Sequence, residues 1–335
     1  MKIDQQTQLN LFYQMLRIRM VEEAIADAYP EQKMRTPVHL SIGQEAAAVA
    51  SGLALEKTDY AMSTHRGHAH YLAKGGDLKA MIAEIYGKVT GCCRGRGGSM
   101  HLIDESVGFM GTTAIVGNTI PVGVGLGLSI QLDSSDRISC IYVGDAATEE
   151  GVFYEALNFA AVKKLPVLFV CENNLYSVYS PLSKRQPKGR KIHELAKAIG
   201  AHVMTADGYN MLESYETMCK AVDKVRAGVG PCFVELSTYR WREHCGPAFD
   251  NDIGYRSVEE YEAWASKDPV AQFKKDLQKT FSLKEEVFAD MQNKIQVEIK
   301  KAFAFAEASD FPDAIEATTG EYVSSPVKES VQCES

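Results

Sequence analysis

Apolar residues recur every three or four positions near the start of the chain, and this spacing predicts an amphipathic helix over residues 7–28. Residues 43–55 and 78–86 fit helices by the same criterion. Between these two segments, residues 61–70 (AMSTHRGHAH) are polar and rich in histidine. This composition indicates a loop at a functional site.

From residue 137 onward, short apolar runs alternate with longer amphipathic ones. Residues 138–144 (ISCIYVG) and 166–171 indicate buried strands on either side of a helix predicted at 149–162, with a start near Thr148. The alternation continues through residues 192–199, 201–204, 212–227 and 232–236. Such an order is typical of an α/β fold with a mostly parallel sheet and helices on both faces.

The pattern also suggests how the chain is divided. Residues 1–270 are predicted to form one main α/β domain, and residues 271–335 a C-terminal helical packing segment that includes a helix at 285–307. Residues 183–190 (SKRQPKGR) contain Pro and Gly between predicted elements, which favours a mobile loop there.

Composition narrows the class of protein. With 335 residues, 45% hydrophobic and 24% charged, the chain has the balance of a soluble globular protein, and its net charge of −8 argues against a general nucleic-acid surface. The weakly polar stretch 114–132 contains Pro121 and Asn118, so no membrane span is expected. The eight cysteines form no CxxC pair, which predicts reduced thiols and a cytoplasmic location.

Candidate chemistry follows the two predicted strands. Gly144 and Asp145 end the first strand, and Glu172, Asn173 and Asn174 end the second. Ligands of open parallel sheets bind at this edge, and a carboxylate with an amide offers oxygen ligands to Mg²⁺. The helix expected near Thr148 would direct its amides at an anion there. Taken alone, Gly-Asp or Asn-Asn after a strand indicates a turn. Because 29 positions and a predicted helix lie between Asp145 and Asn174, the two pairs together predict a Mg²⁺–diphosphate site.

These residues stand in a sequence that resembles a known family. Residues 144–178 (GDAATEEGVFYEALNFAAVKKLPVLFVCENNLYSV) are similar to the thiamine-diphosphate motif in the alpha subunit of the decarboxylase component of 2-oxoacid dehydrogenases, of the pyruvate, acetoin and branched-chain types. Further similar motifs occur in the same order: HLSIGQEAAAV (39–49), THRGHAHYLAKGGDL (64–78), GRGGSMHL (95–102), IVGNTIPVGVGLGL (115–128) and VELSTYRWREH (234–244). The resemblance covers roughly residues 10–270 and implies the thiamine-diphosphate-binding fold.

The resemblance implies a role for particular residues. Asp145, Asn174 and the main-chain oxygen of Tyr176 would bind Mg²⁺, and His39 and His244 would act at the substrate end as acid–base or stabilising groups. His65 occupies a position usually held by Tyr beside the cofactor. The remaining implied cofactor contacts are Arg66 and Arg240 for the phosphate oxygens, Gly144, Ala146 and Ala147 for the diphosphate through the main chain, and residues from Ala114 to Val116 for the aminopyrimidine.

The resemblance also implies partners. In this family the Glu that activates the aminopyrimidine comes from a beta subunit, which implies an α₂β₂ heterotetramer with the cofactor at the subunit interface. The thiamine cofactor supplies the carbanion chemistry, so this chain would position a small 2-oxo acid and exclude water. A lipoyl-bearing acyltransferase would be the next component.

The sequence departs from the family pattern in two places. Ala146 and Ala114 stand where Gly is usual. The family's Tyr-His-Gly-His-Ser type loop, which meets the lipoyl domain, is replaced by WREHCGPAFDNDIGYRS (241–257). The altered loop favours an alternative, a decarboxylase or carboligase of a biosynthetic pathway that passes its acyl group to another acceptor.

Two other classes of protein have weaker support in the sequence. VGVGLG (122–127) could suggest a dinucleotide binder, but its spacing is not GxGxxG, and close packing between helices explains its glycines better. A catalytically silent, partner-binding subunit is supported only by Ala146.

Overall fold

The computed structural model describes residues 3 to 319. Within them, six strands form one parallel sheet in the order β2-β1-β3-β4-β8-β7. This confirms the predicted α/β class. The strands are β1 (Tyr60–Ser63), β2 (Phe109–Thr112), β3 (Ser139–Gly144), β4 (Val167–Asn173), β7 (His202–Asp207) and β8 (Cys232–Ser237); β5 (Tyr176–Ser177) and β6 (Ser180–Pro181) form a separate antiparallel pair.

The two central strands end at the same level. β3 and β4 run in register from the pair Ser139–Val167 to the pair Gly144–Glu172. Because both strands are parallel, the residues that follow them emerge side by side at the carboxyl edge of the sheet. Asp145 and Asn174 thus start from neighbouring positions although 29 positions separate them in sequence.

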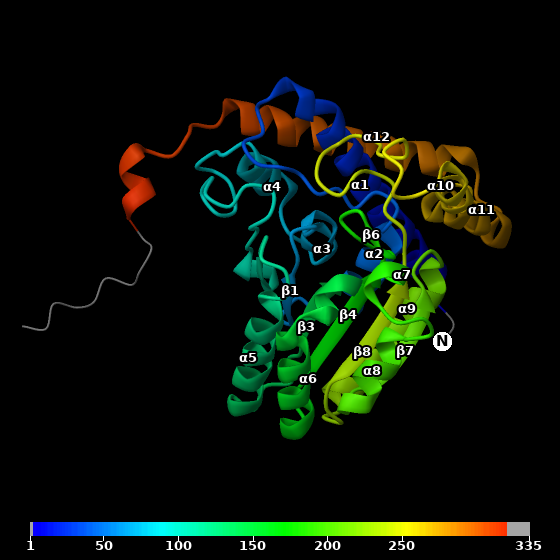
Figure 1. Cartoon of the computed structure of the whole chain (residues 1–335). Helices are drawn as coiled ribbons and strands as arrows, with labels where there is room; N and C mark the ends of the chain where they lie inside the picture. The colour runs from blue at the N-terminus through cyan, green and yellow to red at the C-terminus, as the bar shows by residue number, and fades with distance from the viewer. Residues whose placement is uncertain (1–2, 320–335) are drawn as a thin grey trace, which may run out of the picture.

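Helices cover both faces of the sheet (Figure 1). Ile141 and Val143 of β3 belong to a core with α5 (Thr119–Leu132), α6 (Gly151–Lys163) and α8 (Ile192–Ile199). The alternate residues, Cys140 and Tyr142, belong to a larger core with α2 (Glu45–Ala54) and α9 (Met211–Arg226). Since successive strand residues point to opposite faces, a strand buried on both sides reads as one apolar run, as ISCIYVG does.

The N-terminal and C-terminal helices lie together above the sheet (Figure 1). α1 (Gln5–Ala28) contacts α11 (Pro269–Phe281) and α12 (Glu285–Ala308), and α12 also packs on α4 (Leu78–Ile85). Phe12 of α1 meets Phe288 edge-on at 5.2 Å between ring centroids. The remaining helices are α3 (His68–Ala73), α7 (Leu182–Arg185) and α10 (Val258–Ala265). The division at residue 270 stays a prediction, and part of the C-terminal segment, residues 320–335, lies outside the described residues.

Most of the expected helices and strands are confirmed to within a few residues, the helix expected from residue 149 among them, but two predicted loops were partly wrong and one strand was missed. The segment taken as a polar loop contains the end of β1 and the start of α3, and β2 was missed; both strands are only four residues long. The helix expected from residue 149 begins at Gly151, after a 3₁₀ turn over Asp145–Glu149. The predicted loop 183–190 begins within α7.

The glycines of α5 have a different partner from the one expected. A Cβ added at Gly123 would lie 2.4 Å from Cγ1 of Ile141, and one at Gly127 would lie 2.4 Å from Cγ2 of Val167. These glycines therefore let the helix approach strands β3 and β4, whereas helix–helix packing had been expected. The run VGVGLG is inside a helix and does not form a nucleotide-binding turn.

The structure also bears on the state of the cysteines and on the expectation of no membrane span. The seven cysteines between residues 3 and 319 are free thiols, while Cys333 lies outside this range. Of the helices within the same range, none combines the length and the apolar character needed to cross a bilayer.

Candidate active site

Five neighbouring strands contribute residues to one region at the carboxyl edge of the sheet. The chain after β2 carries Ala114 and Val116, the chain after β1 carries His65 and Arg66, and the chains after β3, β4 and β8 carry Asp145, Asn174 and His244. His39 comes from the segment before α2, where a backbone bridge to Gly246 fixes it beside the chain that follows β8. These residues line a common pocket.

Asp145 lines this pocket, and a positively charged side chain contacts its carboxylate. Its carboxylate is 1% exposed, and the guanidinium of Arg185 forms an ion pair with Oδ2. The second arm of Arg185 contacts Oε1 of Glu149 at 2.5 Å, and its Nε donates to the carbonyl of Ser180 at 3.1 Å. Burial raises the pKa of Asp145, and the charge of Arg185 opposes that rise. The Arg185 charge thus partly neutralises the buried carboxylate through Oδ2.

Asn174 is held by a chain of buried polar contacts. Gln44 accepts a hydrogen bond from Nδ2 of Asn174 at 3.2 Å and donates one to Oε2 of Glu172 at 3.2 Å. Oε1 of Glu172 lies 3.2 Å from Nε2 of His70, whose Nδ1 lies 2.8 Å from the Ser63 hydroxyl. Because Gln44 binds the amide nitrogen of Asn174, the amide oxygen points the other way. There it accepts a hydrogen bond from the main-chain N–H of Tyr176 at 3.2 Å.

The side chain of Tyr176 points out of the pocket. Its hydroxyl donates to Oε1 of Glu260 at 2.7 Å, and the ring meets Tyr255 edge-on. Tyr176 lines the pocket, and because its side chain is bonded elsewhere, its main chain is the part available to a ligand. A carboxylate, an amide oxygen and a main-chain oxygen at one place are the oxygen donors that Mg²⁺ takes in proteins, so the residues present fit such an ion.

The turn after β3 presents small side chains to the pocket. A Cβ added at Gly144 would meet no described heavy atom within 4 Å, and Ala146 and Ala147 carry single methyl groups. The main chain of the 3₁₀ turn is thus open to a close approach by a ligand. Arg66, 5% exposed, lines the same pocket and donates to the carbonyls of Leu40 at 2.7 Å and His244 at 3.1 Å.

Three histidine rings meet at the other end of the pocket. The centroid of His39 lies 4.7 Å from that of His65 and 5.2 Å from that of His244, and His65 and His244 are 5.2 Å apart. Burial, together with the charge of Arg66, lowers the pKa of His39 to about 2, of His244 to about 3 and of His65 to about 4. All three imidazoles are therefore neutral at pH 7.

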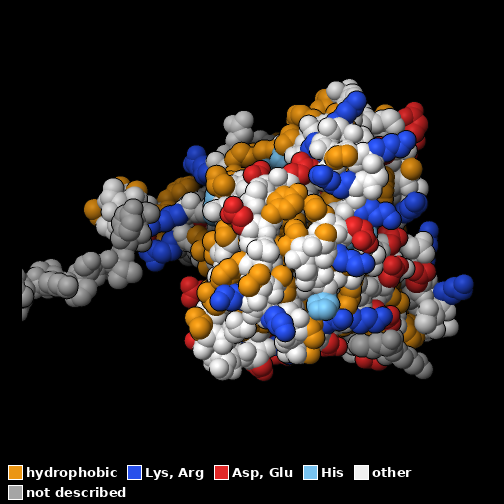
Figure 2. All heavy atoms as spheres, turned by 60° about the horizontal axis from the view of Figure 1, so that its bottom comes forward, with side chains coloured by type: hydrophobic (Ala, Val, Ile, Leu, Met, Phe, Trp, Pro, Cys, Tyr) orange, Lys and Arg blue, Asp and Glu red, His pale blue; other side chains and the backbone are white. Residues whose placement is uncertain are grey.

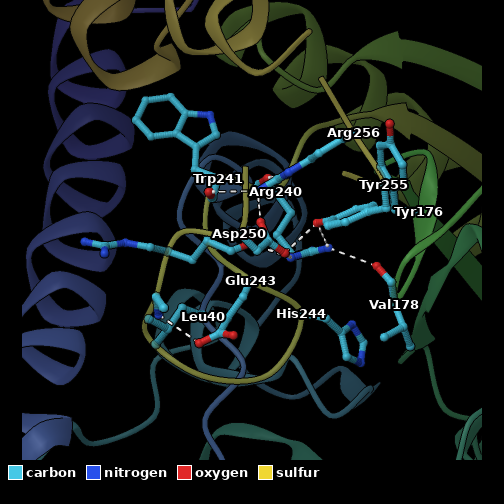
Figure 3. Close-up of polar contacts among 12 residues, drawn as sticks. Leu40, Tyr176, Val178, Arg240, Trp241, Glu243, His244, Asp250, Tyr255 and Arg256 are labelled. Carbon is cyan, nitrogen blue, oxygen red and sulfur yellow. Dashed lines mark hydrogen bonds and ion pairs between the residues drawn. The ribbon is translucent and has the colours of Figure 1, made fainter. Parts of the chain in front are cut away.

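Arg240 does not line the pocket with the other predicted residues. Its Nη2 donates to the Val178 carbonyl at 3.2 Å and to the Tyr255 hydroxyl at 3.0 Å, and Nη1 lies 3.5 Å from Asp250. In Figure 3 the guanidinium lies among these groups, and the His244 ring points away from them. A phosphate contact by Arg240, as the resemblance implied, would require it to give up these bonds.

The structure therefore brings together every predicted site residue except Arg240, although what they bind stays a prediction. Sequence reasoning gave no role to Gln44, Glu172 or Arg185, which hold or neutralise Asn174 and Asp145. The Glu172-Asn173-Asn174 run and the basic loop around Arg185 were both noticed, but their contacts depend on tertiary structure. The other lining residues without an assigned role are Thr64, Met100, Thr113, Gly117, Thr119, Ser177 and Val178.

Fold and site together define a class of protein: an α/β enzyme whose ligand binds at the carboxyl edge of a parallel sheet, beside a carboxylate and an amide placed for a cation. The sequence model of the family described as dehydrogenase E1 component matches residues 13–315. The chain belongs to this family and is an alpha subunit of the thiamine-diphosphate-dependent 2-oxoacid dehydrogenase type.

Characterised relatives match along nearly their whole length. The chain is 35% identical over 326 residues to the alpha subunit of acetoin:2,6-dichlorophenolindophenol oxidoreductase of Bacillus subtilis, covering 97% of this chain and 96% of that protein. It is 34% identical over 315 residues to the pyruvate dehydrogenase E1 component subunit alpha of Porphyra purpurea, covering 92% and 90%. The corresponding subunit of Rickettsia bellii is 32% identical, covering 93% and 94%. The family resemblance expected from the motifs is thus confirmed.

Proposed function

We propose that this chain binds thiamine diphosphate through Mg²⁺ and takes part in the decarboxylation of a 2-oxo acid. The observation that carries the proposal is the meeting of Asp145 and Asn174 at the ends of adjacent parallel strands in one pocket. Tyr176 would add a main-chain ligand to the ion. Gly144, Ala146 and Ala147 would accept the diphosphate along the main chain, and Arg66 would neutralise its oxygens.

When bound, thiamine diphosphate supplies the nucleophilic carbon and the electron sink that decarboxylation of a 2-oxo acid needs. The chain's own residues position the 2-oxo acid and supply proton donors and acceptors beside it. Arg66 faces Nδ1 of His244 at 3.5 Å, which places the proton of this neutral ring on Nε2. His244 and His39 can therefore donate or accept a hydrogen bond at the substrate end without carrying charge.

The cofactor part of the proposal is tested by calorimetry on the chain together with its beta subunit. Thiamine diphosphate with Mg²⁺ should bind with one site per alpha chain, and Asp145→Asn should weaken binding by at least about 100-fold, since a charged metal ligand is lost. Asp207→Asn, an exposed position at the end of β7, is the matched control. Unchanged binding in Asp145→Asn would refute the site.

We also propose a beta subunit as partner, in an α₂β₂ assembly. Ile115 and Val116 line the pocket yet are 66% and 50% exposed, so this wall of the site is itself uncovered. Next to it, α5 and α6 expose large apolar residues, among them Leu132 and Val162. Figure 2 shows hydrophobic side chains gathered over this side, whereas charged side chains crowd the side of α7, α8 and α9. Exposed apolar area of this kind is typical of a subunit interface.

The interface is tested by co-purification. Val162→Glu places a charge on α6, and it should abolish co-purification of the beta subunit while the chain stays folded. Val229→Glu, an exposed apolar position in the loop before β8, should leave the complex intact. Equal retention of the beta subunit by both variants would exclude this face.

The substrate and acyl acceptor are proposed more broadly. The names of the relatives mention pyruvate and acetoin, and a small 2-oxo acid with a lipoyl-bearing acyltransferase as acceptor is our first proposal. The second candidate, a carboligase or decarboxylase that does not use a lipoyl domain, is favoured by the loop after β8. There Arg242 stacks on Phe249, and the Glu243 N–H donates to the Ala248 carbonyl, so the loop is closed on itself.

Reductive acylation of a lipoyl domain by the reconstituted complex separates these two candidates. Rapid acylation supports the first, whereas condensation of the acyl group with an added aldehyde, without acylation, supports the second. A cytoplasmic location and the lack of nucleic-acid or membrane partners also remain predictions, and cell fractionation tests the location.

A further inference from the structure

The three histidines at the substrate end have the arrangement of a metal-binding cluster. One ring nitrogen of each of His39, His65 and His244 lies within 4.8 Å of those of the other two. They come from three separate segments, before α2, after β1 and after β8, which the sheet edge and the His39–Gly246 bridge hold together. Three imidazoles with a fourth position left open are a common ligand set for Zn²⁺.

One ring nitrogen in this cluster has no hydrogen-bond partner among the described residues. Nδ1 of His39 is buried and makes no hydrogen bond with any described residue. A buried ring nitrogen without a partner is costly, and a metal ion bound there would satisfy it. Tetrahedral bonds of about 2.0–2.1 Å place the nitrogens roughly 3.4 Å apart, so modest rotations of the three rings would close the cluster.

The protonation state also suits a metal. Imidazole binds a metal only in its neutral form, and these three rings are neutral at pH 7, so protons do not compete. Nδ1 of His244 is the unprotonated nitrogen, and its only described contact is the long 3.5 Å approach of Arg66, which keeps its shorter bonds to the Leu40 and His244 carbonyls.

The charge around the cluster selects the kind of metal. The charge of Arg66 acts on all three histidines, and that of Arg240 acts on His244, so the local potential is positive. Hard ions such as Mg²⁺ bind mainly through charge and prefer oxygen, so they are disfavoured here. Borderline ions such as Zn²⁺, Co²⁺, Ni²⁺ and Cu²⁺ gain from imidazole coordination itself and can overcome this repulsion.

We infer that His39, His65 and His244 form a second cation site, selective for borderline transition metals and distinct from the oxygen site at Asp145. A metal held there would occupy the substrate end of the pocket. Zn²⁺ would consequently inhibit the enzyme at this site even when Mg²⁺ and cofactor are in place.

The test uses Co²⁺ as a spectroscopic probe on the full chain without thiamine diphosphate. Excess Mg²⁺ is present throughout to fill the oxygen site. One Co²⁺ per chain should bind with the intense visible absorption of a four-coordinate, nitrogen-bound ion, and Zn²⁺ should displace it. A weak, six-coordinate Co²⁺ spectrum alone would overturn the inference. Because thiamine diphosphate is absent, this result is independent of the proposed function.

Variants assign the ligands. His65→Phe should weaken Co²⁺ binding by at least about tenfold and remove the intense band, whereas His202→Phe, at an exposed histidine on β7, should behave as wild type. Circular dichroism checks that each variant is folded, and His244→Gln replaces His65→Phe if the latter fails to fold. An unchanged band in a folded His65→Phe or His244→Gln protein would show that the cluster is not the site.

Discussion

The guanidinium of Arg185 is ion-paired with the buried carboxylate of Asp145, and only 11% of the Arg185 side chain is exposed. A buried carboxylate needs a positive neighbour or a proton, since burial alone disfavours its charge. Arg185 supplies that charge from α7. We therefore expect a metal ion that binds Asp145 to compete with Arg185 for this carboxylate.

Arg185→Gln should consequently have two opposite effects. The cofactor-free chain should lose about 3 kcal/mol of stability, the order expected when a buried ion pair loses one partner. At the same time Mn²⁺ should bind more tightly, because its competitor is gone. Thermal unfolding and titration of the free Mn²⁺ electron paramagnetic resonance signal measure the two effects. Arg190→Gln, at an exposed position of the same loop, should change neither, and weaker Mn²⁺ binding in Arg185→Gln would contradict competition.

Gln44 should matter for metal binding although it is not expected to touch the metal. Gln44→Leu removes the hydrogen bonds to Asn174 and to one carboxylate oxygen of the buried Glu172, which should cost about 1–3 kcal/mol of stability. Without its partner the Asn174 amide can turn, and affinity for Mg²⁺ with thiamine diphosphate should fall about 10- to 100-fold. Isothermal calorimetry measures this loss. Gln272→Leu, at an exposed position on α11, is the control, and full affinity in Gln44→Leu would exclude a positioning role.

The glycines of α5 should respond in opposite ways to the same substitution. Gly123→Ala or Gly127→Ala pushes a methyl group into Ile141 or Val167 and should destabilise the chain by about 1–3 kcal/mol. Gly125→Ala meets no described heavy atom within 4 Å and should stabilise the helix by about 0.5–1 kcal/mol. Urea unfolding compares the three variants. Equal effects at Gly123 and Gly125 would mean that close packing on the sheet does not explain these glycines.

Stability should fall as the pH is lowered from 7.5 to 5.5. The pKa values of His39, His65 and His244 lie at about 2, 4 and 3, below the ordinary 6.5, so the unfolded chain binds more protons than the folded chain between pH 6.5 and about 4. Their contribution is fully present above pH 6.5 and is lost below it. The Arg66 guanidinium, whose charge lowers the pKa of all three rings, keeps its positive charge throughout this range.

Urea unfolding at several pH values measures this dependence. His65→Phe removes one of the three groups and should flatten the curve between pH 7.5 and 5.5. His202→Phe should leave it unchanged, because that side chain is exposed. A curve of the same slope in His65→Phe and wild type would show that the His65 pKa is not lowered.

The sequence alone determined the α/β class, the order of most helices and strands, and the pairing of Asp145 with Asn174. The periodicity of buried residues is local, and parallel strands joined by a crossover helix must bring their carboxyl ends to one edge. β1 and β2 were not predicted, because a strand of four residues is too short for its alternation of side chains to distinguish it from a loop.

Only the tertiary structure decided which side chains complete the site. Gln44 meets both Glu172 and Asn174, and Arg185 meets Asp145, across many positions of sequence, so no spacing along the chain predicts those contacts. The same applies to the three histidines and to Arg240, whose partners are chosen by the path of the chain after β8. The physical reason is that residue type sets what a side chain can bind, whereas the packed fold sets which partner is within reach.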